Sequence, residues 1–245
     1  MTIEVKWSFG TNDEWYQDTP DCIKPLIDPD YYPYTRLSKD SVELRKGSTY
    51  LKCPAHTDFL KNIFVFRAPF DVTIVNVRGE HQGEIWCENL TQEQFEKIID
   101  VRFLSGDDAK INPYPIVGID WLNTFMSEES VLLQLLPAFM HYNDFTDKCT
   151  IIPGEYDISK WTRPVEIAWE FKKETSKVTI KKGDALCYFK FNCDDIVKLT
   201  EQPIPWDESK ICANIRQEHT FRPLKERYQQ LAEAKAANKC PYKPS

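Results

Sequence analysis

His56 and Asp58 are separated by one residue, a spacing at which the end of one strand can offer an imidazole and a carboxylate to the same metal ion. Non-haem iron(II) oxygenases bind their iron through such a pair together with one distant histidine, the facial triad. His141 follows His56 by 85 residues (141 minus 56) and could complete the triad, and His219 is its substitute. The pattern predicts a candidate metal site of His56, Asp58 and His141, with iron(II) and 2-oxoglutarate as the cofactors.

The chain lacks one part of that oxygenase pattern, the arginine that holds the carboxylate of the co-substrate a short distance after the distant histidine. Ile151 stands where that arginine is expected after His141, and the next arginine is Arg163. After His219, Arg222 follows too closely. We therefore keep a metal-dependent oxygenase, either iron(II)/2-oxoglutarate or cupin-like, as the alternative function, and a structural or exposed His56 as the main interpretation.

Other catalytic classes lack their local signatures. The chain has no G-x-S-x-G nucleophile motif, and its eight glycines form no phosphate-binding loop. The segments Val117–Trp121 and Thr179–Leu186 are similar to two motifs of deoxyuridine triphosphatases, but the arginine-serine phosphate motif and the Gly-rich C-terminal arm are missing. The eight cysteines have no repeated spacing and no C-x-x-C pair, which is typical of reduced, buried thiols and leaves zinc as a minor alternative.

A group of aromatic residues is the strongest candidate for a binding surface. Trp15, Tyr31, Tyr32 and Tyr34 fall in a Pro-rich segment, residues 11–39, that shows no strand pattern and is predicted to be a long ordered loop. Aromatic side chains on a loop can recognise a partner. They can equally close one end of a β-sandwich, and the sequence leaves both interpretations open.

The charge balance argues against two classes of partner. The formal net charge is -7, from 31 basic and 38 acidic residues, so the whole chain has no positive field for phosphate backbones or anionic lipid. Nucleic acid is therefore an unfavoured partner. The N-terminus has no signal-peptide pattern, and no apolar run reaches the roughly 18 residues of a membrane span. We expect a cytoplasmic protein without a membrane partner.

Alternating hydrophobicity predicts strands along most of the chain. Helical signals are few: a capping box at Thr91 and Gln94 predicts a short helix over 92–101, and Pro223 begins a predicted C-terminal helix with a basic tail. The predicted strands cover residues 1–9, 48–53, 62–67, 71–77, 84–87, 115–126, 130–136 and 195–200.

Two further alternating runs, Val165–Phe171 and Lys177–Phe191, predict a β-hairpin, with Gly183 and Asp184 as turn residues. With the other strands they indicate an all-β fold. We expect a two-sheet sandwich of jelly-roll or double-stranded β-helix type, with one short inserted helix and a C-terminal helix. The predicted domains are a single sandwich over 1–222 and a helix with its tail over 223–245.

Short motifs give a resemblance to a known family. Lys52–Ala55, Asp58, Lys61–Asn62 and Pro69–Asp71 resemble segments of an uncharacterised family of single-domain β-proteins from tailed bacteriophages and some bacteria, over about Trp7 to Phe191. The resemblance implies an all-β body in a bacterial host cell or virion, and it carries over no catalytic residue. Our main functional prediction is a non-catalytic interaction or structural protein that binds a protein partner or associates with itself.

Overall fold

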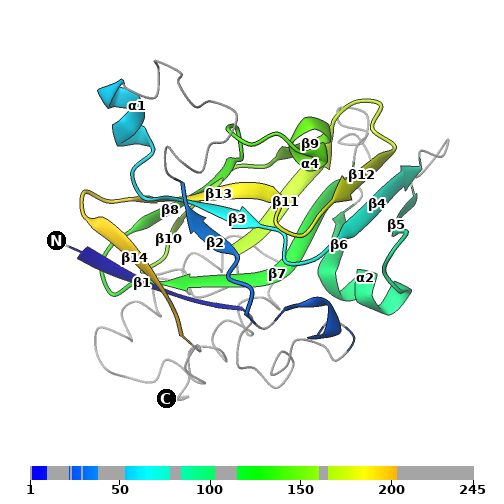
Figure 1. Ribbon diagram of the computed structural model, residues 1–245, viewed down its shortest axis with the longest axis horizontal. Coiled ribbons are helices and arrows are strands. Elements are labelled where there is room, and N and C mark those ends of the chain that lie inside the picture. Colours follow the sequence, from blue (N-terminus) through cyan, green and yellow to red (C-terminus); the bar gives the residue numbers. More distant parts are fainter. Residues whose placement is uncertain are drawn as a thin grey trace, which may run out of the picture.

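The computed structural model describes residues 2–9, 22, 24–28, 30–37, 53–77, 84–102, 115–159 and 165–202, and these form three β-sheets with short helices at their margins (Figure 1). The all-β prediction is confirmed. Several expectations lie outside the described residues: the C-terminal helix from Pro223, the strand residues 48–52, and the positions of Trp15 and His219.

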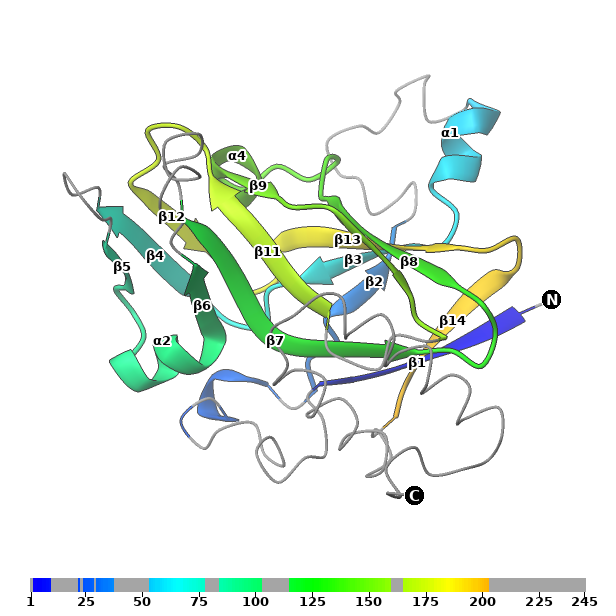
Figure 2. The same cartoon turned by 180° about the vertical axis from the view of Figure 1, so that it is seen from behind.

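The largest sheet has six strands in the order β14-β1-β7-β11-β9, with β6 also paired to β7. Its centre is the 11-residue strand β7, which β1 and β6 contact along different halves of one edge while β11 occupies the other edge. Figure 2 brings β7 and β11 to the front. The strands are β1 (Thr2–Phe9), β6 (Ile99–Arg102), β7 (Ile116–Met126), β9 (Cys149–Ile151), β11 (Val165–Phe171) and β14 (Ile196–Glu201).

A five-stranded sheet and a three-stranded sheet complete the fold, so the expectation of only two sheets needs correction. The five-stranded sheet, in the order β10-β8-β13-β3-β2, consists of β10 (Gly154–Asp157), β8 (Leu132–Pro137), β13 (Ala185–Asn192), β3 (Ile63–Arg67) and β2 (Tyr34–Arg36). The three-stranded sheet, in the order β12-β4-β5, consists of β12 (Lys177–Ile180), β4 (Val72–Val77) and β5 (Glu84–Cys87).

The main core lies between the sheets and is rich in aromatic side chains. Phe125 of β7 meets Phe189 of β13 at 5.0 Å between ring centroids, so the two larger sheets are in direct contact. Burial of large aromatic side chains is a major stabilising contribution, and tilted or edge-on ring pairs add to it. The alternating burial of β1 and β11 follows the predicted period of two, with every second side chain in this core.

A second, smaller hydrophobic cluster covers the outer face of the five-stranded sheet. Tyr188 of β13 and Val65 of β3 belong to it, although their strand neighbours face the main core. Met140, from the loop after β8, and Leu60, which ends the first α-helix, cover these strand residues. This sheet is therefore buried on both faces over part of its area.

The short helices are η1 (Lys24–Leu26), α1 (Pro54–Phe59), α2 (Gln92–Ile98) and α4 (Asp144–Lys148). The capping box of α2 is confirmed, because Thr91 Oγ1 accepts from Gln94 N and Gln94 Oε1 accepts from Thr91 N. Helix α2 ends earlier than expected, and residues 99–102 form β6. Helices α1 and α4 were not predicted; Cys53, expected at the end of a strand, is the N-cap of α1.

The predicted hairpin is wrong in its pairing, although its strands are confirmed. β11 pairs with β7 and β9, β12 pairs with β4, and β13 pairs with β3 and β8. The three consecutive strands therefore lie in three different sheets. Both connections contain a residue with positive φ, Glu174 at 69° and Gly183 at 90°, and such residues let the chain turn sharply out of one sheet and into the next.

Candidate functional site

Three large aromatic side chains are exposed where α1 and the loop between β8 and α4 meet. Phe59 of α1 is 40% exposed, and Phe139 and Tyr142 of the loop are 42% and 54% exposed. The rings of Phe59 and Phe139 lie 6.1 Å apart, so the helix and the loop form one continuous patch. We call Phe59, Phe139 and Tyr142 the aromatic surface.

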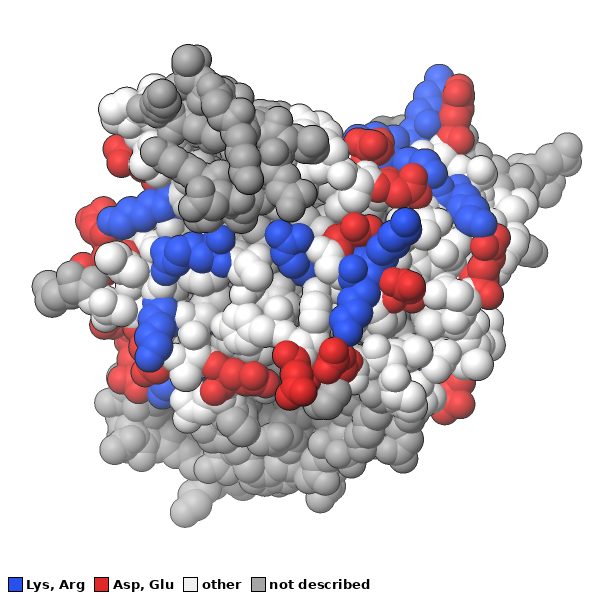
Figure 3. Space-filling model, viewed as in Figure 1, with Lys and Arg blue, Asp and Glu red and all other residues white. Residues whose placement is uncertain are grey.

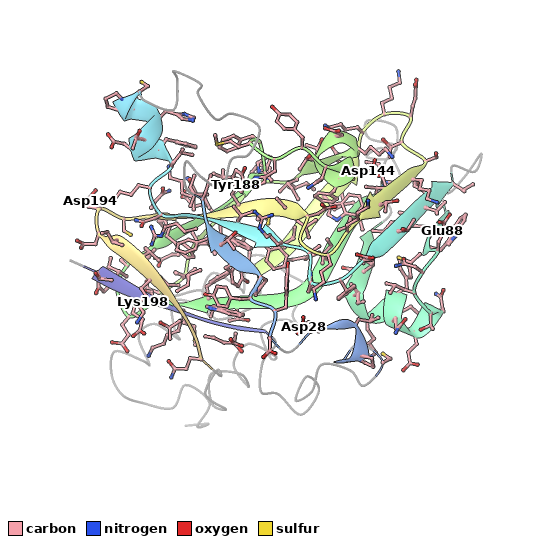
Figure 4. The ribbon with its side chains drawn as sticks, in the orientation of Figure 1. Asp28, Glu88, Asp144, Tyr188, Asp194 and Lys198 are labelled. Atoms are coloured by element: carbon pink, nitrogen blue, oxygen red, sulfur yellow. The ribbon has the colours of Figure 1, made fainter. Side chains whose placement is uncertain are left out.

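Tyr188 of β13 packs beneath the loop that carries Phe139 and Tyr142. Its side chain is fully buried on β13, and Figure 4 shows it on the side of the sheet where α1 and α4 lie. The hydroxyl accepts a hydrogen bond from Met140 N at 3.0 Å and lies 2.7 Å from His141 Nδ1. Its ring also meets Phe139 edge-on, at 5.1 Å between centroids. Tyr188 thus fixes the loop to the sheet at three consecutive residues, Phe139, Met140 and His141.

Polar contacts also fix the second half of the loop. Asn143 and Thr146 form a capping box at the start of α4, and Asn143 Nδ2 donates to Ala185 O at 2.8 Å. Asp144 Oδ2 accepts from Thr179 N at 2.7 Å, and this bond joins α4 to β12. Burial would raise the pKa of Asp144, but the hydrogen bonds from Lys148 and Thr179 hold the pKa below its usual value. The carboxylate is therefore charged and fixes α4 in position.

A cavity of about 240 Å³ lies beside the aromatic surface, and Phe139 and Tyr142 line both. Phe145 and Ile151 form an apolar part of the cavity wall, and His141 contributes its imidazole to the lining. Lys172 also lines the cavity, and its ammonium donates to the carbonyl oxygens of Thr146 and Asp147 at 2.9 and 3.0 Å. The wall combines polar and apolar groups in comparable amounts.

His141 is neutral in this environment. Burial is the main cause that lowers its pKa to about 4, and the positive charge of Arg67 lowers it further. Its Nδ1 is engaged with the Tyr188 hydroxyl. Its Nε2 is buried and has no hydrogen-bond partner among the residues that the structure describes. Because Nε2 has almost no accessible surface, it lies against protein and does not face the open space of the cavity.

The described residues do not form the predicted iron site. His56 and Asp58 lie two positions apart on helix α1 instead of at a strand end, and residues at that helical spacing do not face each other. His141 contacts Tyr188 instead of a carboxylate. Within the described ranges, no three His, Cys, Asp or Glu side chains come together in a group that could hold a metal ion. His219 lies outside these ranges.

The aromatic residues predicted as a binding surface have different environments. Tyr34 is 2% exposed and belongs to strand β2, so it is a core residue and the prediction is corrected at this position. Tyr31 is half-buried, and its hydroxyl donates to Ala68 O at 2.8 Å. Tyr32 is 44% exposed, and its hydroxyl accepts from Trp7 Nε1 at 3.2 Å. Tyr31 and Tyr32 thus cover one margin of the core.

The aromatic surface itself was missed from the sequence. Phe139 and Tyr142 fall in Pro137–Asn143, an apolar stretch after a strand, and its composition is typical of buried segments as well as exposed ones. The sequence around Phe59 shows no helical pattern of hydrophobic residues, because α1 has only six residues. Pro137 was the one available sign that the strand ends before Phe139.

The charged side chains give no dominant field on the face shown in Figure 3, where basic and acidic residues are interspersed with uncharged surface. No helix in the described ranges combines the length and apolar character needed to cross a membrane. No family model matches the chain, and comparisons with curated proteins and with solved structures find no match. The resemblance to phage and bacterial β-proteins stays a prediction.

Proposed function

We propose that this protein acts without catalysis, by binding a protein partner through the aromatic surface of Phe59, Phe139 and Tyr142. The observation that carries the proposal is the exposure of these three side chains, between 40% and 54%, in one place beside a cavity. Aromatic residues dominate the binding energy of protein interfaces, especially next to a pocket that a partner side chain can enter. Large aromatic residues grouped on a surface are costly in water unless a partner covers them.

The rigidity of the surface supports the same proposal. Tyr188 and the capping box of α4 fix the loop before any partner arrives. A surface that is already ordered loses less conformational entropy on binding, so more of the contact energy appears as affinity. Lys190 adds a cation over the Phe59 ring, 4.0 Å from its centroid, which orients that ring at the edge of the surface.

The proposal keeps the setting and fold type that the sequence predicts. These are a sandwich of jelly-roll or double-stranded β-helix type, and a phage or bacterial protein that works in the cytoplasm of the host cell or in the virion. Self-association is the second form of the same interaction. The aromatic surface would then meet another copy of the chain.

A peptide-display selection on the full chain tests the proposal. We expect enriched peptides whose Kd rises at least about tenfold when Phe139→Ala or Tyr142→Ala removes one exposed ring. Trp86→Ala is the matched control, since Trp86 is 37% exposed on β5 of a different sheet, and its Kd should equal that of wild type. Near-UV circular dichroism establishes that each variant is folded.

Sedimentation velocity of the same variants tests the self-association form, in which Phe139→Ala reduces a concentration-dependent dimer and Trp86→Ala does not. The proposal fails if no peptide is enriched and the chain stays monomeric. It also fails if the enriched peptides bind Phe139→Ala and Tyr142→Ala as tightly as wild type. Metal-independent, saturable turnover of a small molecule by the purified protein would disprove its non-catalytic part.

A further inference from the structure

The aromatic surface is suited to a proline-rich segment. Its three side chains are between 40% and 54% exposed, and the rings of Phe59 and Phe139 lie 6.1 Å apart at an angle of 48°. Phe139 and Tyr142 also line the cavity, so the surface includes a recess. Domains that recognise proline-rich ligands offer exposed aromatic side chains around a groove, and the ligand docks there as a preformed polyproline II helix.

The chain itself contains a segment of this kind. Pro241–Pro244 has the sequence P-Y-K-P, a P-x-x-P motif. A polyproline II helix has three residues per turn, so the two prolines fall on the same side of it, about 9 Å apart at a rise of about 3.1 Å per residue. This distance exceeds the 6.1 Å between the rings of Phe59 and Phe139, so the two prolines can contact different members of the aromatic surface.

The charges of the segment and of the aromatic surface are complementary. Residues 235–245 contain no acidic residue and three basic ones. The basic residues are Lys235, Lys239 and Lys243. Asp58 precedes Phe59 and is exposed, and Asp147 is exposed at the wall of the cavity. Neither aspartate forms an ion pair with another residue in the part of the chain that the structure describes.

The cations near the aromatic surface are engaged by the protein itself. Lys148 forms an ion pair with Asp144 at 2.7 Å, and Lys172 donates to two carbonyl oxygens of α4. The ammonium of Lys190 lies over the Phe59 ring. The two exposed aspartates are therefore the charged groups with which lysines of an incoming segment can pair.

The end of β14 and the aromatic surface lie on opposite sides of the body. Figures 1 and 2 share a vertical axis, and in both α1 lies at the top and the end of β14 toward the bottom. The sequence continues for 43 residues (245 minus 202) after Gln202, the last residue that the structure describes, and 38 of these precede Pro241 (241 minus 203).

This length favours a contact between copies over a contact within one copy. A random coil of that many residues spans on the order of 30 Å, whereas a compact body of this chain length is roughly 45 Å across. The segment therefore reaches the surface of a neighbouring molecule more readily than the far side of its own.

We propose that the aromatic surface of one copy binds the Pro241–Pro244 segment of a second copy, with the prolyl rings on the exposed aromatic rings and the lysines beside Asp58 and Asp147. This inference rests on the proposed function, because it names the partner and the part of the partner that binds. The contact is heterologous, since each copy offers a segment at one place and a surface at another.

A synthetic peptide of residues 235–245, with Cys240→Ser to prevent oxidation, tests the recognition by fluorescence anisotropy. The receptor is the full chain with Pro241→Ala and Pro244→Ala, so that its own segment does not compete. We expect the peptide to bind at least about tenfold more tightly than a scrambled peptide in which the two prolines are adjacent. Equal affinities for the two peptides would overturn the inference.

Changes in the receptor test where the peptide binds. Phe139→Ala or Tyr142→Ala should raise the Kd at least about tenfold, and Trp86→Ala should leave it unchanged. Asp58→Asn should raise the Kd about two- to fivefold at low ionic strength and have no effect in about 1 M salt. Unchanged affinity in both aromatic variants would overturn the inference, and an effect of Asp58→Asn that is independent of salt would contradict the charge pairing.

A mixture of two full-length variants shows whether the contact forms between copies. Phe139→Ala keeps the segment, and the variant with Pro241→Ala and Pro244→Ala keeps the surface. By sedimentation velocity, each alone should stay monomeric at concentrations where the wild type associates, and the mixture should form a complex. Pro203→Ala with Pro205→Ala, the matched control, should associate like the wild type. A mixture without a complex, or a monomeric wild type, would overturn the contact between copies.

The display selection separates this inference from the proposed function. If enriched peptides require the aromatic surface but the 235–245 peptide binds no better than the scrambled one, the interaction surface stands and the segment is wrong. If neither the enriched peptides nor the 235–245 peptide requires the aromatic surface, the proposed function is wrong as well.

Discussion

The carboxamide oxygen of Asn62 accepts a hydrogen bond from the backbone N–H of Val197 at 3.0 Å, between residues 135 positions apart in the chain. Asn62 Nδ2 donates to Asp195 O at 2.7 Å, so the same side chain binds the backbone on both sides of Ile196, the first residue of β14. The guanidinium of Arg36 donates to the carbonyl of Val197. Side chains from the five-stranded sheet and from the residue before β3 thus occupy the outer edge of β14 in the six-stranded sheet.

Asn62→Ala should lower the free energy of unfolding by about 2–4 kcal/mol. The change leaves the buried N–H of Val197 without its acceptor and removes the amide donor to Asp195 O, and it places alanine at a φ of 57°, which L-residues disfavour. Urea unfolding followed by tryptophan fluorescence measures the loss. Asn62→Gly also removes the side chain, but glycine adopts a positive φ without strain. This variant should therefore be about 1 kcal/mol more stable than Asn62→Ala. Wild-type stability in both variants would show that Asn62 does not hold the turn.

The stability of the wild type should fall between pH 6.5 and about 4 through His141. The pKa of this histidine is about 4 in the folded protein, chiefly because of burial, against 6.5 in its unperturbed form. In this window the unfolded chain binds a proton that the folded chain does not, so stability increases with pH and levels off above 6.5. Urea unfolding as a function of pH measures the slope.

His141→Gln is the control for this slope, because its side chain stays polar and does not titrate. Carboxylates contribute in the same way to both proteins, so the difference in stability between wild type and variant isolates the histidine. We expect that difference to change between pH 6.5 and 4 and to be constant above. A difference that stays flat throughout would mean that His141 is accessible and protonates normally.

Gly183→Ala should reduce the free energy of unfolding by about 1–2 kcal/mol through the backbone alone. Gly183 has φ of 90° in the turn between β12 and β13, and a Cβ at this position would meet no atom within 4 Å. Asp184 closes the same turn, since its Oδ2 accepts from Lys181 N at 2.8 Å. Gly183→Asn, which tolerates positive φ better, should lose less in thermal unfolding. Equal losses for the two variants would point to a cause other than φ.

The purified protein should show no saturable binding of iron(II), with or without 2-oxoglutarate. His56 and Asp58 share a short helix and diverge from each other, and His141 is engaged with Tyr188. Anaerobic titration calorimetry measures the binding directly, and elemental analysis of the protein as isolated checks for resident metal. Stoichiometric binding that both His56→Ala and His219→Ala weaken would contradict this expectation and restore the oxygenase hypothesis.

The candidate site was only weakly predictable from sequence. The sequence marks His141 as a chemically capable residue, but its contact with Tyr188 joins residues 47 positions apart, and no local pattern encodes such a pair. Tyr34 falls in a segment without a strand pattern and is therefore predicted to lie on a loop, whereas β2 pairs with β3 and carries it into the core. Exposure of an aromatic residue depends on what covers it, and that is a property of the folded chain.

The sequence by itself determined where most of the longer strands lie and where α2 begins, but it did not predict the short strands β2, β6, β9 and β10. The alternation of Val165–Phe171 and the capping box of Thr91 with Gln94 act through neighbouring residues, so they survive in the fold. Only the tertiary structure decided that β11, β12 and β13 lie in three different sheets. A period of two tells which face of a strand is buried, but every strand offers the same backbone donors and acceptors at its edges. The choice of partner therefore depends on how distant side chains fill one core.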